Sequence, residues 1–268
     1  MADIDVKYLR DKGVPQLLEG IAADIASQKP ADPEAFLRAR FAGGSAGGVS
    51  AGEEVKLYAN QLDPGCAMAL VAAAYARVAV VYSEVDVSKN QHITPEFGRL
   101  SPFHQVPVLD HNGVVLADAG AVTRYLCSGT PATPQGARER AKVDAAFEAI
   151  RTHVLPAATA AAQETVLLPA RNHRPIDQHA LQAHVESTRS ALRTVATAYF
   201  KDSTWVVGKD FSLADIALAA VAFTMKNTVG VDCFGEGSLK LWFDAVQREP
   251  SYAQGLKDYM AAAAAAAR

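Results

Sequence analysis

Segments with strand periodicity and segments with helix periodicity alternate along residues 55–128. In the first kind apolar residues alternate with polar ones or form short runs, and in the second they recur every three to four residues. His111-Asn112-Gly113 separates two apolar runs and is typical of a hairpin turn. The pattern predicts strands at residues 55–59, 80–85, 106–109 and 114–117, and helices that begin at Pro64 and Asp118. This order, βαβ followed by ββα, predicts a small mixed sheet.

The pattern beyond residue 133 is helical throughout, apart from a break expected around residues 168–175. Ser212 and Asp215 have the spacing of a capping box, and they open the strongly apolar segment "DIALAAVAFTM". We therefore expect an all-helical domain after the mixed sheet, so the predicted fold class is α+β.

The first forty residues carry a separate helical pattern. One apolar stripe is formed by Leu17, Leu18, Ile21, Ala22 and Ile25. Lys29-Pro30 ends this helix and Asp32-Pro33 opens another. Two helices of this length bury too little surface to be stable alone, so self-association is expected. The alternative, packing on the chain's own main domain, is disfavoured by the glycine-rich linker at residues 42–54.

Composition and residue spacing exclude several functions. A net charge of −3 gives no general attraction to nucleic acid, and no apolar run reaches the roughly 18 residues of a membrane span. The N-terminus lacks the apolar core of a secretion signal. Cys66, Cys127 and Cys233 are odd in number and widely spaced, which favours a reducing compartment, so we expect a cytoplasmic protein. His179 and His184 are five residues apart, not four, so no metal site is expected.

Residues 95–126, "PEFGRLSPFHQVPVLDHNGVVLADAGAVTRYL", resemble the signature of the glutathione transferase superfamily. "WVVGKDFSLADI" is similar to the pattern around the family's capped core helix. The resemblance covers residues 55 to about 258. It implies a thioredoxin-like, glutathione-binding domain at residues 55–130 and an all-helical domain at residues 131–268, in a homodimer. The activity that it implies is conjugation or reduction of small electrophiles with glutathione as co-substrate, as in detoxification.

The resemblance also implies where glutathione binds. In the family, the residue that matches Val106, beside Pro107, offers its backbone N–H and C=O to the cysteinyl part of glutathione, as an added strand would. Val106-Pro107 is compatible with a cis peptide. Asp118 opens a helix and matches the acidic residue that holds the γ-glutamyl end. Ala119 stands where the family has a serine, so one hydroxyl contact is missing.

Three more residues match the family near the glycine end of glutathione. His104 and Gln105 match positions that reach the glycine carboxylate and backbone in several classes, and His92 resembles another histidine near the same end. Structural interpretations stay open beside these. Asp118 can serve only as an N-cap, and His92 and His104 can be solvated loop residues.

In the family, a Ser, Cys or Tyr donates a hydrogen bond that stabilises the glutathione thiolate, and this chain has none of them at the expected position. The serine- or cysteine-using classes place the donor where this chain has Asp63. An ionised aspartate only accepts hydrogen bonds and repels a thiolate. Asp63-Pro64 is also a favourable N-cap with proline at the first helical position, which is the interpretation we prefer. Cys66 lies in the first helical turn, where a thiol pKa can fall, and we interpret it as a core residue first and a redox group second.

Residues 7–41 resemble the dimerisation/docking module of protein kinase A regulatory subunits. The resemblance is carried by Tyr8-Leu9, Val14-Pro15, Leu17-Leu18, Lys29-Pro30, Asp32-Pro33 and Phe36-Leu37. Such modules form a two-chain, four-helix bundle whose groove takes an amphipathic helix. The resemblance implies that residues 1–41 are a docking module with an anchoring protein as partner.

Two rival functions remain. The transferase fold can act as a non-catalytic scaffold, which Asp63, Ala119 and the docking segment favour. A thiol–disulfide reductase that uses Cys66 is the third hypothesis, and it requires this thiol to be accessible.

Overall fold

The computed structural model describes residues 14–28, 49, 54–60, 62–201 and 203–255. The chain divides into two compact units, Met1–Gly44 and Ser45–Arg268. In the first unit the described residues form a single helix, α2 (Val14–Gln28), over the segment whose apolar stripe predicts a helix. The second helix expected from Asp32 and nearly all of the linker at 42–54 lie outside the described residues.

A four-stranded mixed sheet begins the second unit, in the order β2-β1-β3-β4. The strands are β1 (Val55–Ala59), β2 (Val80–Glu84), β3 (Val108–His111) and β4 (Val114–Leu116). β1 pairs in parallel with β2 and antiparallel with β3, and β3 pairs antiparallel with β4. Asn112 and Gly113 both have positive φ, 52° and 87°, as a tight hairpin turn requires. The third strand begins later than expected because Pro107 has no N–H to give to the ladder.

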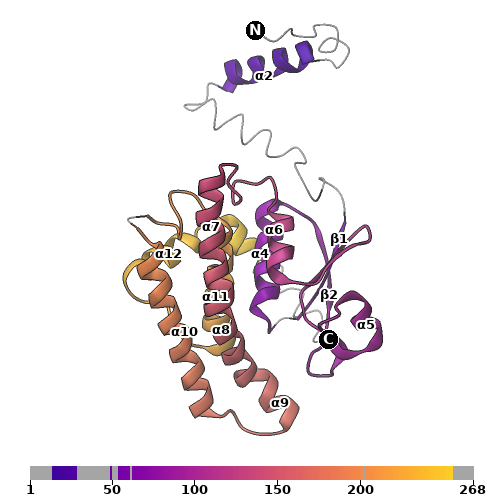
Figure 1. Ribbon diagram of the computed structural model, residues 1–268, viewed down its shortest axis with the longest axis vertical. Helices are drawn as coiled ribbons and strands as arrows, with labels where there is room; N and C mark the ends of the chain where they lie inside the picture. The colour runs from indigo at the N-terminus through magenta and orange to yellow at the C-terminus, as the bar shows by residue number, and fades with distance from the viewer. Residues whose placement is uncertain (1–13, 29–48, 50–53, 61, 202, 256–268) are drawn as a thin grey trace. The chain divides into compact units, whose positions relative to one another are not determined.

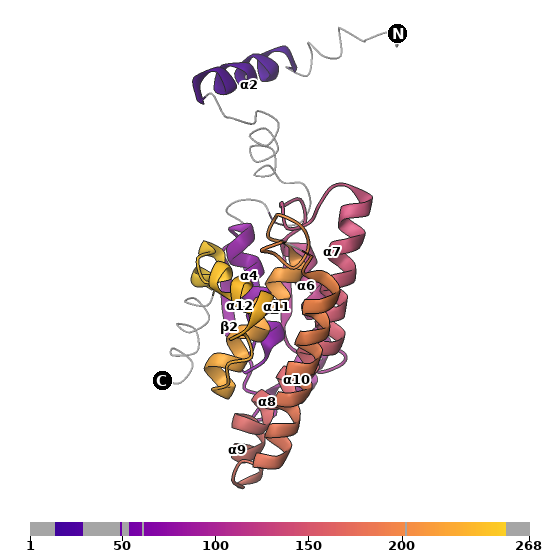
Figure 2. The same cartoon turned by 90° about the vertical axis from the view of Figure 1, so that its left-hand side faces the viewer.

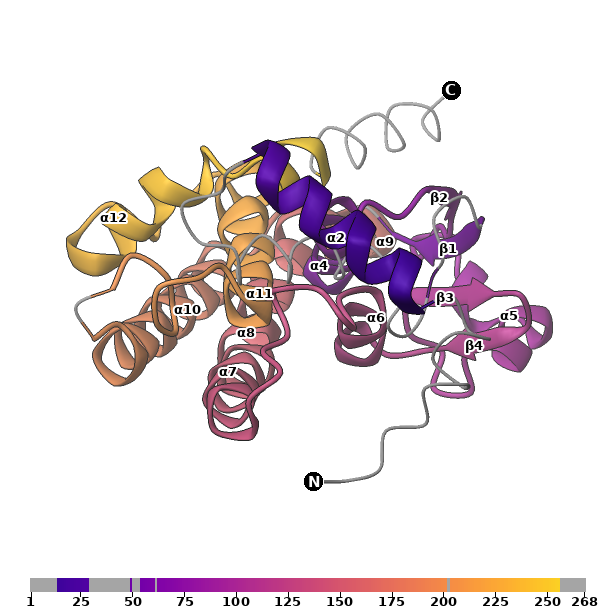
Figure 3. The same cartoon turned by 90° about the horizontal axis from the view of Figure 1, so that it is seen from above.

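Helices cover both faces of the sheet. Figures 1 and 3 show α4 (Pro64–Ala76) and α6 (Ala119–Leu126) between the sheet and the helical domain. On the other face lies α5 (Pro95–Leu100), where Phe97 and Val108 are buried together and Tyr58 meets Phe97 edge to face. The sequence pattern does not predict α5, because six residues show less than two turns of periodicity. A 3₁₀ turn, η1 (Gln91–Ile93), precedes it.

In the described part of the helical domain, three π-helical turns lie between the α-helices. Its elements are α7 (Ala137–Ala149), η2 (Ile150–Val154), α8 (Leu155–Ala162), η3 (Gln163–Leu167), α9 (Leu168–Asn172), α10 (Gln178–Tyr199), α11 (Leu213–Phe223), η4 (Thr224–Val229) and α12 (Gly237–Val246). α7 continues through η2 into α8, Figure 2 shows α10 running alongside them, and α11 packs on α7 and α8. The helix break expected around residues 168–175 is wrong for residues 168–172, which form α9, and the chain leaves the helix at residue 173. Pro169 stands in the first turn of α9, where a missing N–H does no harm.

The two halves of this unit meet at α4 and α11. Every residue of α11 is buried, and so are the first ten residues of α4, which packs against it. The predicted capping box at Ser212 and Asp215 is confirmed. The buried Asp215 carboxylate accepts hydrogen bonds from the Val206 and Ser212 backbones, the Ser212 hydroxyl and the Trp242 indole, at 2.8–2.9 Å. This core fixes the helix starts that form the candidate site. Among the described helices, none combines the length and the apolar character needed to span a bilayer.

Candidate functional site

Asp63 lies in the turn after β1 and caps α4. Its Oδ1 accepts the backbone N–H groups of Gly65 at 2.7 Å and Cys66 at 3.2 Å, and Pro64 occupies the first helical turn. This is the arrangement predicted for an N-cap. Burial raises the pKa of the Asp63 carboxyl to about 6. At neutral pH the group is therefore mostly a carboxylate, which accepts hydrogen bonds and donates none.

Cys66 is fully buried in the first turn of α4. Its Sγ accepts a hydrogen bond from the backbone N–H of Asn60 at 3.3 Å. Burial, and then the nearby Asp63 carboxylate, raise the pKa of the Cys66 thiol well above its ordinary value. Reactive cysteines need a thiolate and access to solvent, and Cys66 has neither. This environment is that of a core residue.

Gly65 is the point where three of the predicted site residues meet. A Cβ on Gly65 would lie 2.8 Å from Oδ1 of Asp63, 2.9 Å from Cβ of Ala119 and 3.5 Å from Cδ of Pro107. The peptide bond between Val106 and Pro107 is cis. The starts of α4 and α6 therefore lie side by side next to Pro107, and only glycine fits between them.

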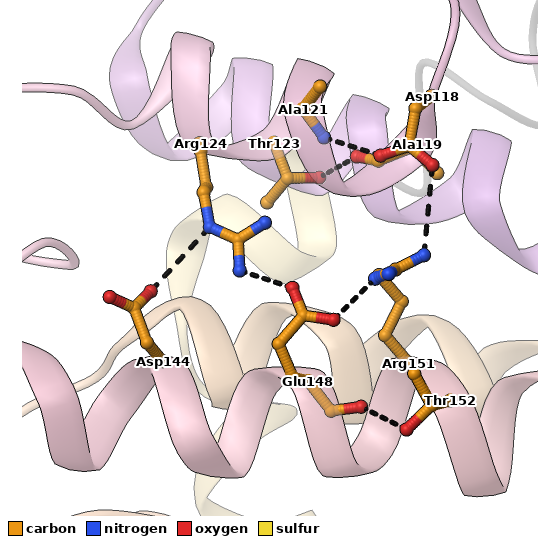
Figure 4. A network of polar contacts seen from close by, with 9 residues as sticks. All are labelled: Asp118, Ala119, Ala121, Thr123, Arg124, Asp144, Glu148, Arg151 and Thr152. Carbon is orange, nitrogen blue, oxygen red and sulfur yellow. Dashed lines mark hydrogen bonds and ion pairs between the residues drawn. The ribbon is translucent and has the colours of Figure 1, made fainter.

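Asp118 caps α6 and keeps half of its side chain in solvent. Its Oδ1 accepts the backbone N–H of Ala121 at 2.8 Å. Its Oδ2 lies 3.7 Å from Nη1 of Arg151, and 51 % of the side chain is exposed (Figure 4). The capping role and a binding role are compatible, because only one carboxylate oxygen makes the capping bond.

Arg151 belongs to a row of ion pairs between the sheet domain and the helical domain. Its Nε donates to Glu148 at 2.9 Å, and Arg124 of α6 pairs with Glu148 and with Asp144 (Figure 4). Burial alone raises the pKa of Glu148, but the guanidinium groups of Arg124 and Arg151 outweigh it and lower that pKa. The sequence analysis missed Arg151. Its only local signal is the i, i+3 spacing to Glu148, since Asp118 is distant in the chain.

His92, His104 and Gln105 lie in the segment between β2 and β3. Nδ1 of His104 is 3.0 Å from the carbonyl oxygen of His92, and His104 has a positive φ of 56°. The Gln105 backbone exchanges two hydrogen bonds with the Ser101 hydroxyl, both 2.9 Å, which leaves the exposed Gln105 side chain for a ligand. Nδ1 of His92 is buried and has no hydrogen-bond partner among the described residues. Burial, and then Arg171 and His104, lower the pKa of His92, so this ring is neutral at pH 7.

The described residues contain no group of three or more His, Cys, Asp or Glu placed to hold a metal ion. A cavity of about 280 Å³ opens between α4 and β2, and none of the predicted site residues lines it. The candidate site therefore consists of the starts of α4 and α6, the Val106-Pro107 peptide and the adjoining His/Gln segment.

Two family models match the chain. The model of the glutathione S-transferase N-terminal domain matches residues 53–128, and that of the C-terminal domain matches residues 158–250. The chain belongs to the glutathione S-transferase superfamily. The predicted α+β fold, a thioredoxin-like domain followed by a helical domain, is confirmed.

Relatives extend over most of the transferase unit. Glutathione S-transferase 3 of Zea mays is 27% identical over 214 residues, which are 74% of this chain and 91% of that protein. Glutathione S-transferase theta-1 of Bos taurus is 25% identical over 201 residues, 72% of this chain and 82% of the relative. Among solved structures, glutathione transferase F2 from Populus trichocarpa superposes with a TM-score of 0.67 at 22% identity, over 77% of this chain and 99% of its own. Human glutathione-S-transferase T1-1 in its apo form gives 0.65 at 22% identity, over 77% and 86%.

Proposed function

We propose that the chain is a glutathione transferase that binds glutathione where α4 and α6 begin and joins its sulfur to a small electrophile. In this reaction the thiol gives its proton to solvent, the sulfur forms a bond to the electrophilic carbon of the second substrate, and the bond from that carbon to its leaving group breaks, so that a halide, for example, departs with the electron pair. The observation that carries the proposal is the meeting of Asp63, Pro107 and Ala119 around Gly65. It brings the segments matched to the family's glutathione site into one place.

Each part of glutathione has a candidate partner. The backbone of Val106, next to cis Pro107, takes the cysteinyl part. Asp118 takes the ammonium group of the γ-glutamyl end through the oxygen that makes no capping bond. His104 and the Gln105 side chain, both exposed, face the glycine end. His92 is neutral, so it contributes a hydrogen bond there and not a charge.

Calorimetric titration of the full chain with glutathione tests this proposal. We expect saturable binding by the native chain and at least about a tenfold loss in Asp118→Ala, because a charge-assisted contact disappears. Asp177→Ala is the matched control, since Asp177 caps α10 through the same kind of bonds and lies outside the site. Both variants lose a cap, worth about 1 kcal/mol of stability, but only the first should lose glutathione.

The absence of any heat of binding at millimolar glutathione would place the interaction at about −4 kcal/mol or weaker, and it would overturn the proposal. Equal affinity in Asp118→Ala and the native chain would remove Asp118 from the site and leave the transferase proposal standing.

One observation favours a second function, that of a non-catalytic interaction protein. Asp63 stands at the position of the activating group, and its carboxylate is engaged in capping α4. A transferase scaffold without thiol activation would tolerate this substitution. The two functions predict different conjugation rates for Asp63→Ser, which places a hydroxyl at residue 63.

A docking role for residues 1–41 extends the proposal. We divide the chain into this module, a linker at 42–54, the glutathione-binding domain at 55–130 and the helical domain at 131–268. The support from the described residues is α2, whose Leu18 is 59 % exposed. The partners would be an amphipathic helix of an anchoring protein and a second copy of the chain, in the cytoplasm.

A further inference from the structure

The start of α6 presents two opposite charges to solvent from two different domains. Asp118 comes from the sheet domain and Arg151 from the π-helical turn η2 of the helical domain. Oδ2 of Asp118 and Nη1 of Arg151 are 3.7 Å apart, which is longer than a hydrogen bond. About half of the aspartate side chain and a third of the arginine side chain are exposed. Both groups can therefore reach a ligand.

The chain makes space for Arg151 at this place. A Cβ on Gly120 would lie 2.9 Å from Cδ and 3.2 Å from Nε of Arg151, and 3.1 Å from Oδ1 of Asp118. The arginine side chain thus lies against the backbone of the first turn of α6. Glu148 holds its Nε from the other side at 2.9 Å. The guanidinium has five N–H donors, so those on its Nη atoms remain for a ligand. Arg151 is fixed in position but not saturated.

The γ-glutamyl end of glutathione carries an ammonium group and a carboxylate on the same carbon atom. Asp118 alone matches only the ammonium group and repels the carboxylate. Ala119 has no hydroxyl to offer in compensation. An arginine beside the aspartate supplies the missing charge and donates hydrogen bonds in the planar geometry that suits a carboxylate.

We propose that Arg151 binds the α-carboxylate of the γ-glutamyl group, while Asp118 binds its ammonium group. This inference rests on the proposed function, and it names the partner that replaces the missing hydroxyl at residue 119. It also makes the subsite selective for a zwitterionic head group, with one contact from each domain.

The test separates the two charges of the ligand. Calorimetry on the full chain uses glutathione and 4-aminobutanoyl-Cys-Gly, which keeps the ammonium group and lacks the carboxylate. Arg151→Gln should weaken the binding of glutathione about 10- to 100-fold and leave the affinity for the second peptide unchanged. Glutaryl-Cys-Gly, which keeps the carboxylate and lacks the ammonium group, should show the same loss in Arg151→Gln as glutathione.

Arg124→Gln is the matched control. Arg124 pairs with Glu148 in the same row of ion pairs but makes no ion pair with Asp118. It should lower the melting temperature much as Arg151→Gln does and leave the affinity for glutathione unchanged. Two outcomes would show that Arg151 has only a structural role, and either would overturn the inference. The first is an equal loss of glutathione affinity in Arg151→Gln and Arg124→Gln. The second is that Arg151→Gln loses as much affinity for 4-aminobutanoyl-Cys-Gly as for glutathione. Unchanged glutathione binding in Arg151→Gln would overturn the inference about Arg151 and leave the proposed function standing. If the native chain does not bind glutathione, both the inference and the proposed function are overturned.

Discussion

The Asp63 carboxylate accepts the backbone N–H groups of Gly65 and Cys66 at the start of α4. The sequence resemblance predicts that the same residue occupies the position from which the family's serine or cysteine donates to the glutathione sulfur. A carboxylate with a pKa of about 6 is charged at pH 7 and raises the free energy of a neighbouring thiolate. At the scale of this residue, the carboxylate satisfies helix capping but opposes thiol activation.

Asp63→Ser should raise the conjugation rate about tenfold or more, because a hydroxyl both caps the helix and donates to a thiolate. The measurement is kcat/KM with glutathione and a chromogenic aryl halide. Asp63→Ala is the control, since it removes the charge without supplying a donor. A gain in both variants would mean that charge repulsion limits the rate, and no gain in either would favour the scaffold function.

Local features made part of the site predictable from the sequence. Asp63 and Asp118 cap their helices as expected, because an N-cap depends on only a few consecutive residues. Arg151 could not be predicted. Its partner Asp118 lies in another domain, and the pairing exists only once α6 has packed against α7 and η2. The neutral state of His92 also depends on burial and on Arg171, which a sequence pattern does not reveal.

At the scale of elements, α4 and α11 form the centre of the transferase unit, and each begins at a carboxyl group, partly buried for Asp63 and fully buried for Asp215. Burial raises the pKa of Asp63 and of Asp215 to about 6. Their pKa in the unfolded chain is about 3.8, so the folded state binds protons more tightly. The contribution of these groups to stability is therefore present in full below about pH 4 and is lost as the pH rises through 6.

Replacing Asp63 by Asn should flatten this dependence, because the amide keeps the capping oxygen and does not ionise. Between pH 4 and pH 6.5 the variant should gain on the order of 1–3 kcal/mol relative to the native chain. Urea unfolding followed by the fluorescence of Trp205 and Trp242, both in the transferase unit, measures it. Asp177→Asn, at the exposed cap of α10, is the matched control for exchanging a capping carboxylate for an amide. Parallel profiles for the native chain and Asp63→Asn would contradict the prediction.

Elements with strong periodicity or clear boundary residues were predicted well, and the others were not. β1 has the expected bounds, and α4 begins at Pro64 as expected. The short α5 was missed, and the break expected around residues 168–175 begins only after α9, which has Pro169 in its first turn. The π-helical turns η2, η3 and η4 have no sequence signature that separates them from α-helix.

The whole molecule combines a transferase unit with a separate N-terminal unit. The first has a continuous core and ion pairs between its two domains. In the second, the described residues form one helix, which is too short to be stable alone in water unless it associates. The proposed docking function would give this helix a partner.

The full chain should bind a fluorescently labelled amphipathic anchoring-helix peptide. Leu18→Arg should reduce this affinity at least about tenfold, because it places a charge in the apolar contact that the exposed Leu18 would make. Fluorescence anisotropy gives both affinities, and Asp118→Ala should bind the peptide as the native chain does. Failure of the native chain to bind, or equal binding by Leu18→Arg, would remove the docking function from the proposal.

The three cysteines differ in how far solvent can reach them. Cys66, in the first turn of α4, and Cys127, at the end of α6, are fully buried, whereas Cys233 is partly exposed. A maleimide will therefore label Cys233 first, which offers a single attachment point for a spectroscopic probe. The other two thiols react only when the helices around them open, since alkylation needs access. Their labelling rates would report how often α4 and α6, the two helices of the proposed glutathione site, open locally.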